Sequence, residues 1–225
     1  MDLVESNLTV ILPTLNEEGA IGQVIDEIRS LPIKCDILVV YTPSSDNTYN
    51  VASCKGVEVA IQTERGKGNA IRFGFGLVKT PYVVMMDSDY TYPAGWIILI
   101  DLALRYYGYD IVICERKWRS PGSMPTLNLL GNKGLSILAS LLFRKRVRDL
   151  CSGMWGFRKE VLDKFNLVSK GFTLEADLFV NAVRNKCSIA QIPSFYRPRP
   201  DGDKSKLKLS DGFKIGWFLI EGRFR

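Results

Sequence analysis

The chain has 225 residues, of which 46% are hydrophobic and 24% charged, the balance of an ordinary globular protein with one large domain. Its formal net charge is +6, so we expect an anionic partner such as a nucleotide, a phosphate, a membrane surface or a nucleic acid. The absence of histidine excludes histidine triads, histidine metal ligands and histidine general bases.

Short apolar runs rich in β-branched residues alternate with amphipathic segments along the chain. Strands are expected at residues 8–12, 37–40, 57–61, 83–86, 111–114 and 189–193. Helices are expected at residues 19–30, from 48, from 66, and at 93–105, 127–143, 171–184 and 211–225. This alternation predicts an α/β fold with a mostly parallel central sheet and helices on both faces.

Residues 83–89 combine an apolar strand with two carboxylates. Four apolar residues run directly into Asp87, Ser88 and Asp89, and Pro93 prevents the strand from continuing. Because unpaired buried charges are costly, the acids indicate either a bound Mg²⁺ or Mn²⁺ with phosphate oxygens, or caps of the following helix. The two acids alone leave both interpretations open.

Other polar loops follow the neighbouring strands. Asn16 and Glu17 follow the first strand, residues 41–48 follow the second, and Lys67 stands between two glycines at a helix start. The Gly-Lys-Gly stretch is either an anion site or a simple loop. Since ligands bind at the carboxyl ends of parallel strands, these loops are expected to converge with the Asp-Ser-Asp stretch. That convergence favours a metal site over caps.

A series of short motifs occurs in a fixed order over nearly the whole chain. They are Pro13-Thr14-x-Asn16-Glu17-Glu18, Ser44-x-Asp46-x-Thr48, Arg65-Gly66-Lys67-Gly68, Asp87-Ser88-Asp89, Arg116, Asp149-x-x-Ser152-Gly153, Gly171-Phe172 with Glu175, and Arg199 through Ser205-Lys206-Leu207. In this order the chain resembles family 2 glycosyltransferases of the GT-A fold, and within them the dolichyl- or polyprenyl-phosphate hexose synthases (dolichol-phosphate mannose synthase-like).

The resemblance implies roles for individual residues. Asp87 and Asp89 match the motif that binds Mg²⁺ or Mn²⁺ and the donor diphosphate. The donor-binding set it implies is Pro13, Leu15, Glu17, Tyr41, Lys67, Asp87, Ser88 and Lys206. The catalytic set it implies, around the acceptor phosphate and the sugar phosphate, is Asp89, Arg116, Lys133 and Arg199.

The chain departs from the family pattern at two positions. Tyr41-Thr42 stands where the family usually has two acids, which leaves the nucleobase unassigned. Thr91 stands where some members have a metal-binding glutamine.

The residue types suit a phosphate acceptor. A hydroxyl nucleophile needs a general base, whereas a lipid monophosphate is already anionic at neutral pH. Glu175 is either such a base or a structural acid at a helix start. A metal on Asp89 would stabilise the leaving diphosphate.

Two apolar segments are flanked by basic residues. Residues 135–143 precede Arg144-Lys145-Arg146, and residues 217–220 lie between Lys214 and Arg223. They predict either helices that lie in a membrane interface or ordinary core helices. We expect a glycosyltransferase domain over residues 1–205 and a basic, amphipathic C-terminal helix over 206–225. No apolar run reaches the length of about 20 residues that a spanning helix needs.

The compartment follows from cysteine usage. Five scattered cysteines without a CxxC pair, and no basic signal region, predict a reduced cytosol. We expect a peripheral protein on the cytosolic face of the membrane, with no nucleic-acid partner, because no nucleic-acid-binding motif is recognisable.

The expected function is metal-dependent, inverting transfer of a hexose from a GDP-mannose or UDP-glucose type donor to dolichyl or polyprenyl phosphate. Two alternatives stay open. One is a soluble transferase with a hydroxyl acceptor, and the other is a non-catalytic module that binds nucleotide sugars.

Overall fold

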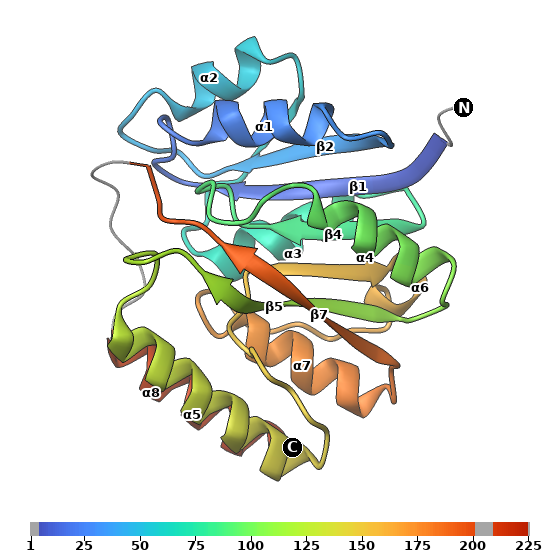
Figure 1. The fold of residues 1–225 in the computed structure, drawn as a ribbon, viewed down its shortest axis with the longest axis vertical. Coiled ribbons are helices and arrows are strands. Elements are labelled where there is room, and N and C mark those ends of the chain that lie inside the picture. Colours follow the sequence, from blue (N-terminus) through green and yellow to red (C-terminus); the bar gives the residue numbers. More distant parts are fainter. Residues whose placement is uncertain (1–4, 201–208, 225) are drawn as a thin grey trace.

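The computed structural model describes residues 5–200 and 209–224. Within these ranges seven strands form one sheet in the order β3-β2-β1-β4-β6-β5-β7 (Figure 1). The strands are β1 (Glu5–Thr14), β2 (Lys34–Tyr41), β3 (Glu58–Ile61), β4 (Tyr82–Met86), β5 (Ile111–Arg119), β6 (Met154–Arg158) and β7 (Ile189–Tyr196). β6 is antiparallel to β4 and β5, and the other described pairs are parallel. The predicted mostly parallel sheet is confirmed.

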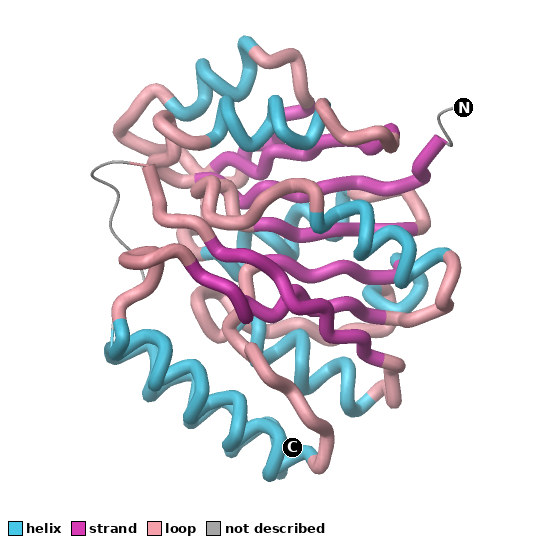
Figure 2. Tube along the Cα trace, in the orientation of Figure 1, coloured by secondary structure: helices cyan, strands magenta, loops and turns pink. Residues whose placement is uncertain are grey.

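Helices cover both faces of the sheet, as predicted (Figure 2). The helices on one face are α1 (Ile21–Arg29), α2 (Thr48–Cys54) and α4 (Trp96–Arg105). Those on the other face are α3 (Lys67–Leu77), α5 (Thr126–Phe143), α6 (Lys159–Leu162), α7 (Leu174–Arg184) and α8 (Leu209–Phe224).

Alternation along the strands explains why both faces are covered. In β1, Val10 and Leu12 pack against the α1 side of the sheet, whereas Ile11 packs against the α3 side. Successive side chains of a strand point to opposite faces, so a strand that is apolar at every position needs helices on both sides. This arrangement leaves the strand ends, rather than the faces, available for a site.

Two features of the sheet differ from the sequence prediction. Residues 154–158 form β6, for which no strand was predicted, and β5 continues to Arg119 beyond its apolar part. The extension forms because β5 pairs with β7 in parallel register, with Glu115 opposite Pro193 and Trp118 opposite Phe195. Long-range pairing thus orders a stretch whose basic sequence is typical of a loop.

The helices α5 and α8 run side by side and both begin near the carboxyl end of the sheet. Gly216 of α8 lies against Leu135 and Leu138 of α5, and Gly222 lies near Phe143. By length and composition alone, α5 is apolar enough to cross a membrane, and only 11% of its residues are buried. The proposed division of the chain at residues 205 and 206 remains a prediction.

Candidate active site

A cavity of about 500 Å³ lies at the carboxyl end of the parallel strands. One part is lined by loops that follow β1, β2 and β4 and by the start of α3. The opposite part is lined by the segment that leads into α5, by α5 itself and by α8. The residues of the first part are Pro13, Thr14, Leu15, Asn16, Glu17, Thr42, Gly66, Lys67, Asp87, Ser88 and Asp89. The predicted convergence of these loops therefore occurs.

The Asp-Ser-Asp stretch is fixed by neighbours on three sides. The Asp87 amide donates to the Gly153 carbonyl at 3.1 Å, and the Ser88 hydroxyl donates to the Pro13 carbonyl at 2.8 Å. A Cβ on Gly153 would lie 1.9 Å from Oδ2 of Asp87, so this position requires glycine. The Thr91 hydroxyl donates to Oδ1 of Asp89 at 2.6 Å. Thr91, which stands where some family members have a metal-binding glutamine, thus contacts Asp89.

Lys67 forms ion pairs with two acidic residues from different segments of the chain. Its Nζ lies 2.6 Å from Oδ1 of Asp87 and 2.7 Å from Oε1 of Glu175, in the first turn of α7. Burial alone would lower the pKa of the Lys67 ammonium, but the charges of Asp87 and Glu175 raise it above its ordinary value. Lys67 is therefore a permanent cation at the site.

The two glycines around Lys67, Gly66 and Gly68, pack directly against the backbone of residues 169 and 170. A Cβ on Gly66 would lie 2.1 Å from the Lys170 carbonyl oxygen, and one on Gly68 would lie 2.5 Å from that of Ser169. The Asn69 amide donates to the Lys170 carbonyl at 3.1 Å. The glycines therefore let this turn approach the segment before α7, which places Lys67 next to Glu175.

Arg199 reaches the other aspartate from beyond β7. Its Nη2 lies 2.5 Å from Oδ2 of Asp89. Burial opposes the charge, but Asp89 raises the pKa of Arg199 above its ordinary value. Each carboxylate of the Asp-Ser-Asp stretch thus has its own cation.

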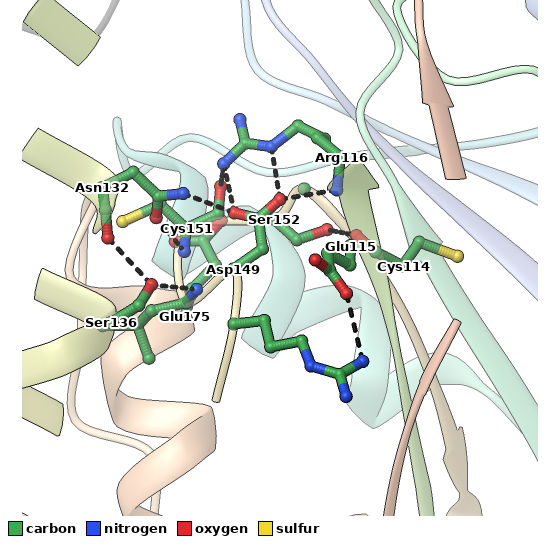
Figure 3. A network of polar contacts seen from close by, with 12 residues as sticks. Cys114, Glu115, Arg116, Asn132, Ser136, Asp149, Cys151, Ser152 and Glu175 are labelled. Atoms are coloured by element: carbon green, nitrogen blue, oxygen red, sulfur yellow. Dashed lines mark hydrogen bonds and ion pairs between the residues drawn. The ribbon is translucent and has the colours of Figure 1, made fainter. Parts of the chain in front are cut away.

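Arg116 is held by Asp149 in a buried pair (Figure 3). Its Nε and backbone N–H both donate to Oδ2 of Asp149 at 2.8 Å, and its Nη2 donates to Oδ1 at 2.6 Å. Asn132 of α5 donates to the same carboxylate at 2.7 Å. Burial would raise the pKa of Asp149, but the Arg116 guanidinium and these hydrogen bonds hold it below its usual range.

Hydrogen bonds fasten the loop after β1 to the loop after β2. Asp46 accepts from the Thr48 hydroxyl at 2.6 Å and from the Glu18 amide at 3.1 Å. The Thr48 hydroxyl accepts from the Glu17 amide at 2.8 Å. Residues 13–18 are thus held as a rigid wall of the cavity, and the Ser-x-Asp-x-Thr motif supplies the braces.

Asp87 and Asp89 are the carboxylates that could hold a divalent ion. Among residues 5–200 and 209–224, no three Asp, Glu, Cys or His side chains gather into a metal-binding group. Mg²⁺ and Mn²⁺ commonly take one or two carboxylates together with phosphate oxygens. Both aspartates line the cavity, so the donor set fits an ion whose shell is completed by a bound diphosphate.

Two residues of the predicted site, Tyr41 and Lys133, are not among the lining residues, and a third, Lys206, is not described. The side chain of Tyr41 is buried, and its hydroxyl accepts from the Ser44 amide at 3.0 Å. Its neighbour Thr42 lines the cavity instead, held by Gln62 at 2.6 Å. Lys133 is exposed on α5 and is not a lining residue. Lys206 falls outside the described residues. The roles of all three stay predictions.

The sequence also left several lining residues unassigned. Asn132, one position before Lys133, lines the cavity and binds Asp149, and Ser123, Asn128 and Tyr196 are lining residues too. Adjacent positions of a helix face different directions. The helical periodicity of residues 127–143 could therefore have predicted that Asn132, rather than Lys133, faces the cavity. No sequence signal pointed to Ser123.

The chain is similar to known glycosyltransferases in sequence. The family model described as Glycosyl transferase family 2 matches residues 9–165. The chain is 32% identical to Glycosyltransferase AglJ of Haloferax volcanii over 201 residues, which cover 88% of this chain but 65% of that protein. It is 31% identical to Dolichyl-phosphate hexose transferase of the same organism over 215 residues, 96% of this chain and 93% of that protein.

The chain is also similar to solved structures. Glucosyl-3-phosphoglycerate synthase from Mycobacterium tuberculosis, crystallised with Mn²⁺, uridine diphosphate and phosphoglyceric acid, matches with a TM-score of 0.73 at 22% identity. The match covers 96% of this chain and 76% of that one, and it supports the GT-A fold. Because the family match extends over residues 9–165, well over half of the chain, this protein belongs to glycosyl transferase family 2 and is a glycosyltransferase.

Proposed function

We propose that this glycosyltransferase moves a hexose from a nucleotide sugar of the GDP-mannose or UDP-glucose type to a dolichyl or polyprenyl phosphate at a membrane surface. The observation that carries the proposal is the wall of the cavity opposite the aspartates. It consists of α5 and α8, and both helices expose large apolar side chains on the outside. A relative named Dolichyl-phosphate hexose transferase supports the same acceptor class.

Each of the two helices has an apolar stripe on its outer face. On α8 the exposed residues Phe213, Trp217, Ile220 and Phe224 recur at steps of three and four. On α5 the exposed residues Leu130, Ile137 and Leu141 lie on one face as well. Side chains of Arg144, Lys145, Lys214 and Arg223 are exposed at their borders. This pattern suits two helices that lie in an anionic membrane interface on the cytosolic side.

The donor would bind on the aspartate side of the cavity. Lys67 and Arg199 neutralise Asp87 and Asp89, so all four groups lie within reach of a diphosphate and its metal ion. A bound Mg²⁺ or Mn²⁺ would stabilise the charge that develops on the leaving diphosphate. The rigid wall at residues 13–18 would hold the nucleoside in one orientation.

The acceptor side offers little to deprotonate a hydroxyl. Glu175, the candidate base, lies 2.7 Å from the Lys67 ammonium, so its carboxylate is already engaged in an ion pair. An acceptor phosphate needs no base, because it is already anionic. Direct attack by its oxygen on the sugar would invert the anomeric centre.

The test is a screen of labelled GDP-mannose and UDP-glucose with polyprenyl phosphate and Mg²⁺ or Mn²⁺. We expect label in the organic phase with at least one donor, and loss of transfer in Asp89→Ala by about a hundredfold or more, as expected for removal of a charge-stabilising group. Failure to label lipid with any common sugar nucleotide would contradict the lipid acceptor. Full activity of the Asp89→Ala variant would contradict the metal role.

A second candidate function is transfer to a small hydroxyl compound. It is favoured by the presence of Glu175 in the cavity, where it could act as a base if Lys67 moved. Transfer without lipid, together with its loss in Glu175→Gln, would support this function. Under the first proposal we expect Glu175→Gln to retain lipid-dependent transfer.

A further inference from the structure

The half of the cavity beside α5 and α8, here called the acceptor half, has no unpaired arginine or lysine among the lining residues that the structure describes. Arg116 donates its Nε and Nη2 to the buried Asp149, and Arg199 is paired with Asp89. Lys133 is exposed on α5 away from the cavity lining. An anion that binds in this half therefore needs other donors, and the neutral groups of the lining can supply them.

Ser123 is such a donor. It lines the cavity, it is only 9% exposed, and its buried Oγ forms no hydrogen bond with any of the described residues. Buried hydroxyl groups in native proteins nearly always have a partner, and an unsatisfied one is costly. The position of Ser123 on the cavity wall places this hydroxyl where a bound ligand can accept its hydrogen bond.

The N-terminus of α5 faces the same space. α5 has 18 residues, and no side chain caps its start at Pro125. The Leu129 amide forms the first helical hydrogen bond, to the Pro125 carbonyl at 3.1 Å, so the amides of residues 126–128 precede the helical ladder. Pro125, Leu127 and Asn128 line the cavity. Uncapped N–H groups and the helix dipole favour an anion at this point.

We propose that Ser123 and the first turn of α5 form a binding site for a phosphate monoester, the head group of the acceptor. The site uses neutral donors, namely the Ser123 hydroxyl, the amides of residues 126–128 and the Asn128 side chain. Arg116, which lines the same cavity, adds positive charge without leaving Asp149. This inference rests on the proposed phosphate acceptor and names the groups that hold its phosphate.

Two variants test the site in the full chain. Ser123→Ala removes the hydroxyl donor. Asn128→Asp places a negative charge in the first turn of α5, where an acid stabilises a helix but repels a bound anion. Ser120→Ala is the matched control, because Ser120 lies in the same loop but not in the cavity lining.

The measurement is calorimetric binding of citronellyl phosphate, with glycerol 3-phosphate as a soluble monoester and citronellol as the uncharged analogue. We expect Ser123→Ala to weaken citronellyl phosphate binding by about tenfold or more, since a hydrogen bond to a charged group is lost. Asn128→Asp should weaken it at least as much, at an unchanged melting temperature. Ser120→Ala should bind citronellyl phosphate as tightly as the wild type, and citronellol should not bind measurably.

The outcomes separate the inference from the proposed function. Binding of citronellyl phosphate by the wild type with equal affinity in both variants would overturn the site and leave the acceptor class standing. No binding of citronellyl phosphate by the wild type would overturn both. Stronger binding of glycerol 3-phosphate, still sensitive to both variants, would support the site while assigning it to a soluble acceptor.

Discussion

Arg116 and Asp149 form a buried ion pair that we expect to contribute to the stability of the fold. Removing one partner of such a pair leaves the other charge buried without compensation, at a cost of about 3–5 kcal/mol. We expect Asp149→Asn to lower the free energy of unfolding by about that amount, measured by urea denaturation. Asp163→Asn is the control, because Asp163 pairs with Lys159 at the surface, where such pairs contribute about 1 kcal/mol or less.

The same ion pair should make the free energy of unfolding depend on pH. The pKa of Asp149 is lowered in the folded protein, because Arg116 and hydrogen bonds outweigh the effect of burial. The unfolded chain therefore takes up this proton first as pH falls, and the stabilisation is present above a pH of about 4 and lost below it. The stability difference between wild type and Asp149→Asn should narrow from pH 7 towards pH 3. A constant difference would contradict this assignment.

At the scale of single residues, the sequence indicated which groups would gather but not how they would pair. Lys67, Arg116 and Arg199 were all expected near the donor or the acceptor, and all three line the cavity. Their partners come from distant segments, as in the pair of Arg116 with Asp149 or of Lys67 with Glu175. Sequence spacing carries no information about such contacts, since they depend on how helices and strands pack.

At the scale of elements, long apolar runs were predictable and β6 was not. Its residues Trp155 and Phe157 face one side of the sheet, while Gly156 faces α4, where a Cβ would lie 2.1 Å from Ile100. Glycine and aromatic residues beside the Ser152-Gly153 motif are typical of a loop as much as of a strand. Insertion between β4 and β5 makes these residues a strand, and that insertion is a property of the whole sheet.

A clamp of three residues connects α1, the loop after β4 and the end of β7. Arg197 lies 2.6 Å from Oε1 of Glu27 in α1, and its guanidinium stands 4.6 Å from the centre of the Tyr90 ring. The Arg197 amide also donates to the Thr91 carbonyl at 2.8 Å. Tyr90 has a left-handed backbone conformation, with φ at 65°, which is uncommon for tyrosine and needs support from the surrounding structure.

We expect this clamp to hold Asp89 in the orientation that binds metal and diphosphate. Arg197→Met and Glu27→Gln should each weaken binding of uridine or guanosine diphosphate in the presence of Mn²⁺ by about tenfold, measured by calorimetry. The fold loss of diphosphate affinity in the double variant should be smaller than the product of the fold losses in the two single variants, because the two residues act through one contact. Asp26→Asn, which breaks the neighbouring exposed pair with Lys55, is the control. If the fold losses of the two single variants multiply in the double variant, the residues act independently and the clamp is contradicted.

At the scale of the whole molecule, exposed apolar and basic side chains occur together on α5 and α8. The net charge is +6, and the apolar stripes of α5 and α8 are bordered by exposed basic residues. Both helices also form a wall of the cavity. Under the proposed function, a lipid acceptor that lies along the stripes would present its head group to the site without leaving the membrane.

The last prediction concerns this face. Replacing Phe213 and Trp217 by serine should reduce binding to phosphatidylglycerol vesicles by about tenfold or more, since burying one large apolar side chain contributes about 1.5–3 kcal/mol. Cosedimentation measures the effect. Tyr106→Ser with Tyr107→Ser is the matched control, because these exposed aromatic residues lie at the end of α4 rather than on α5 or α8.

Salt dependence and oligomeric mass separate a membrane face from a protein interface. If the face binds lipid, raising the salt concentration should weaken binding of the wild type, because basic residues near an anionic surface contribute about 1 kcal/mol each and are screened. Neutral phosphatidylcholine vesicles should bind less than anionic ones. Unchanged vesicle binding in the Phe213 and Trp217 variant, together with a fall in oligomeric mass, would instead assign the stripes to contacts between copies of this chain.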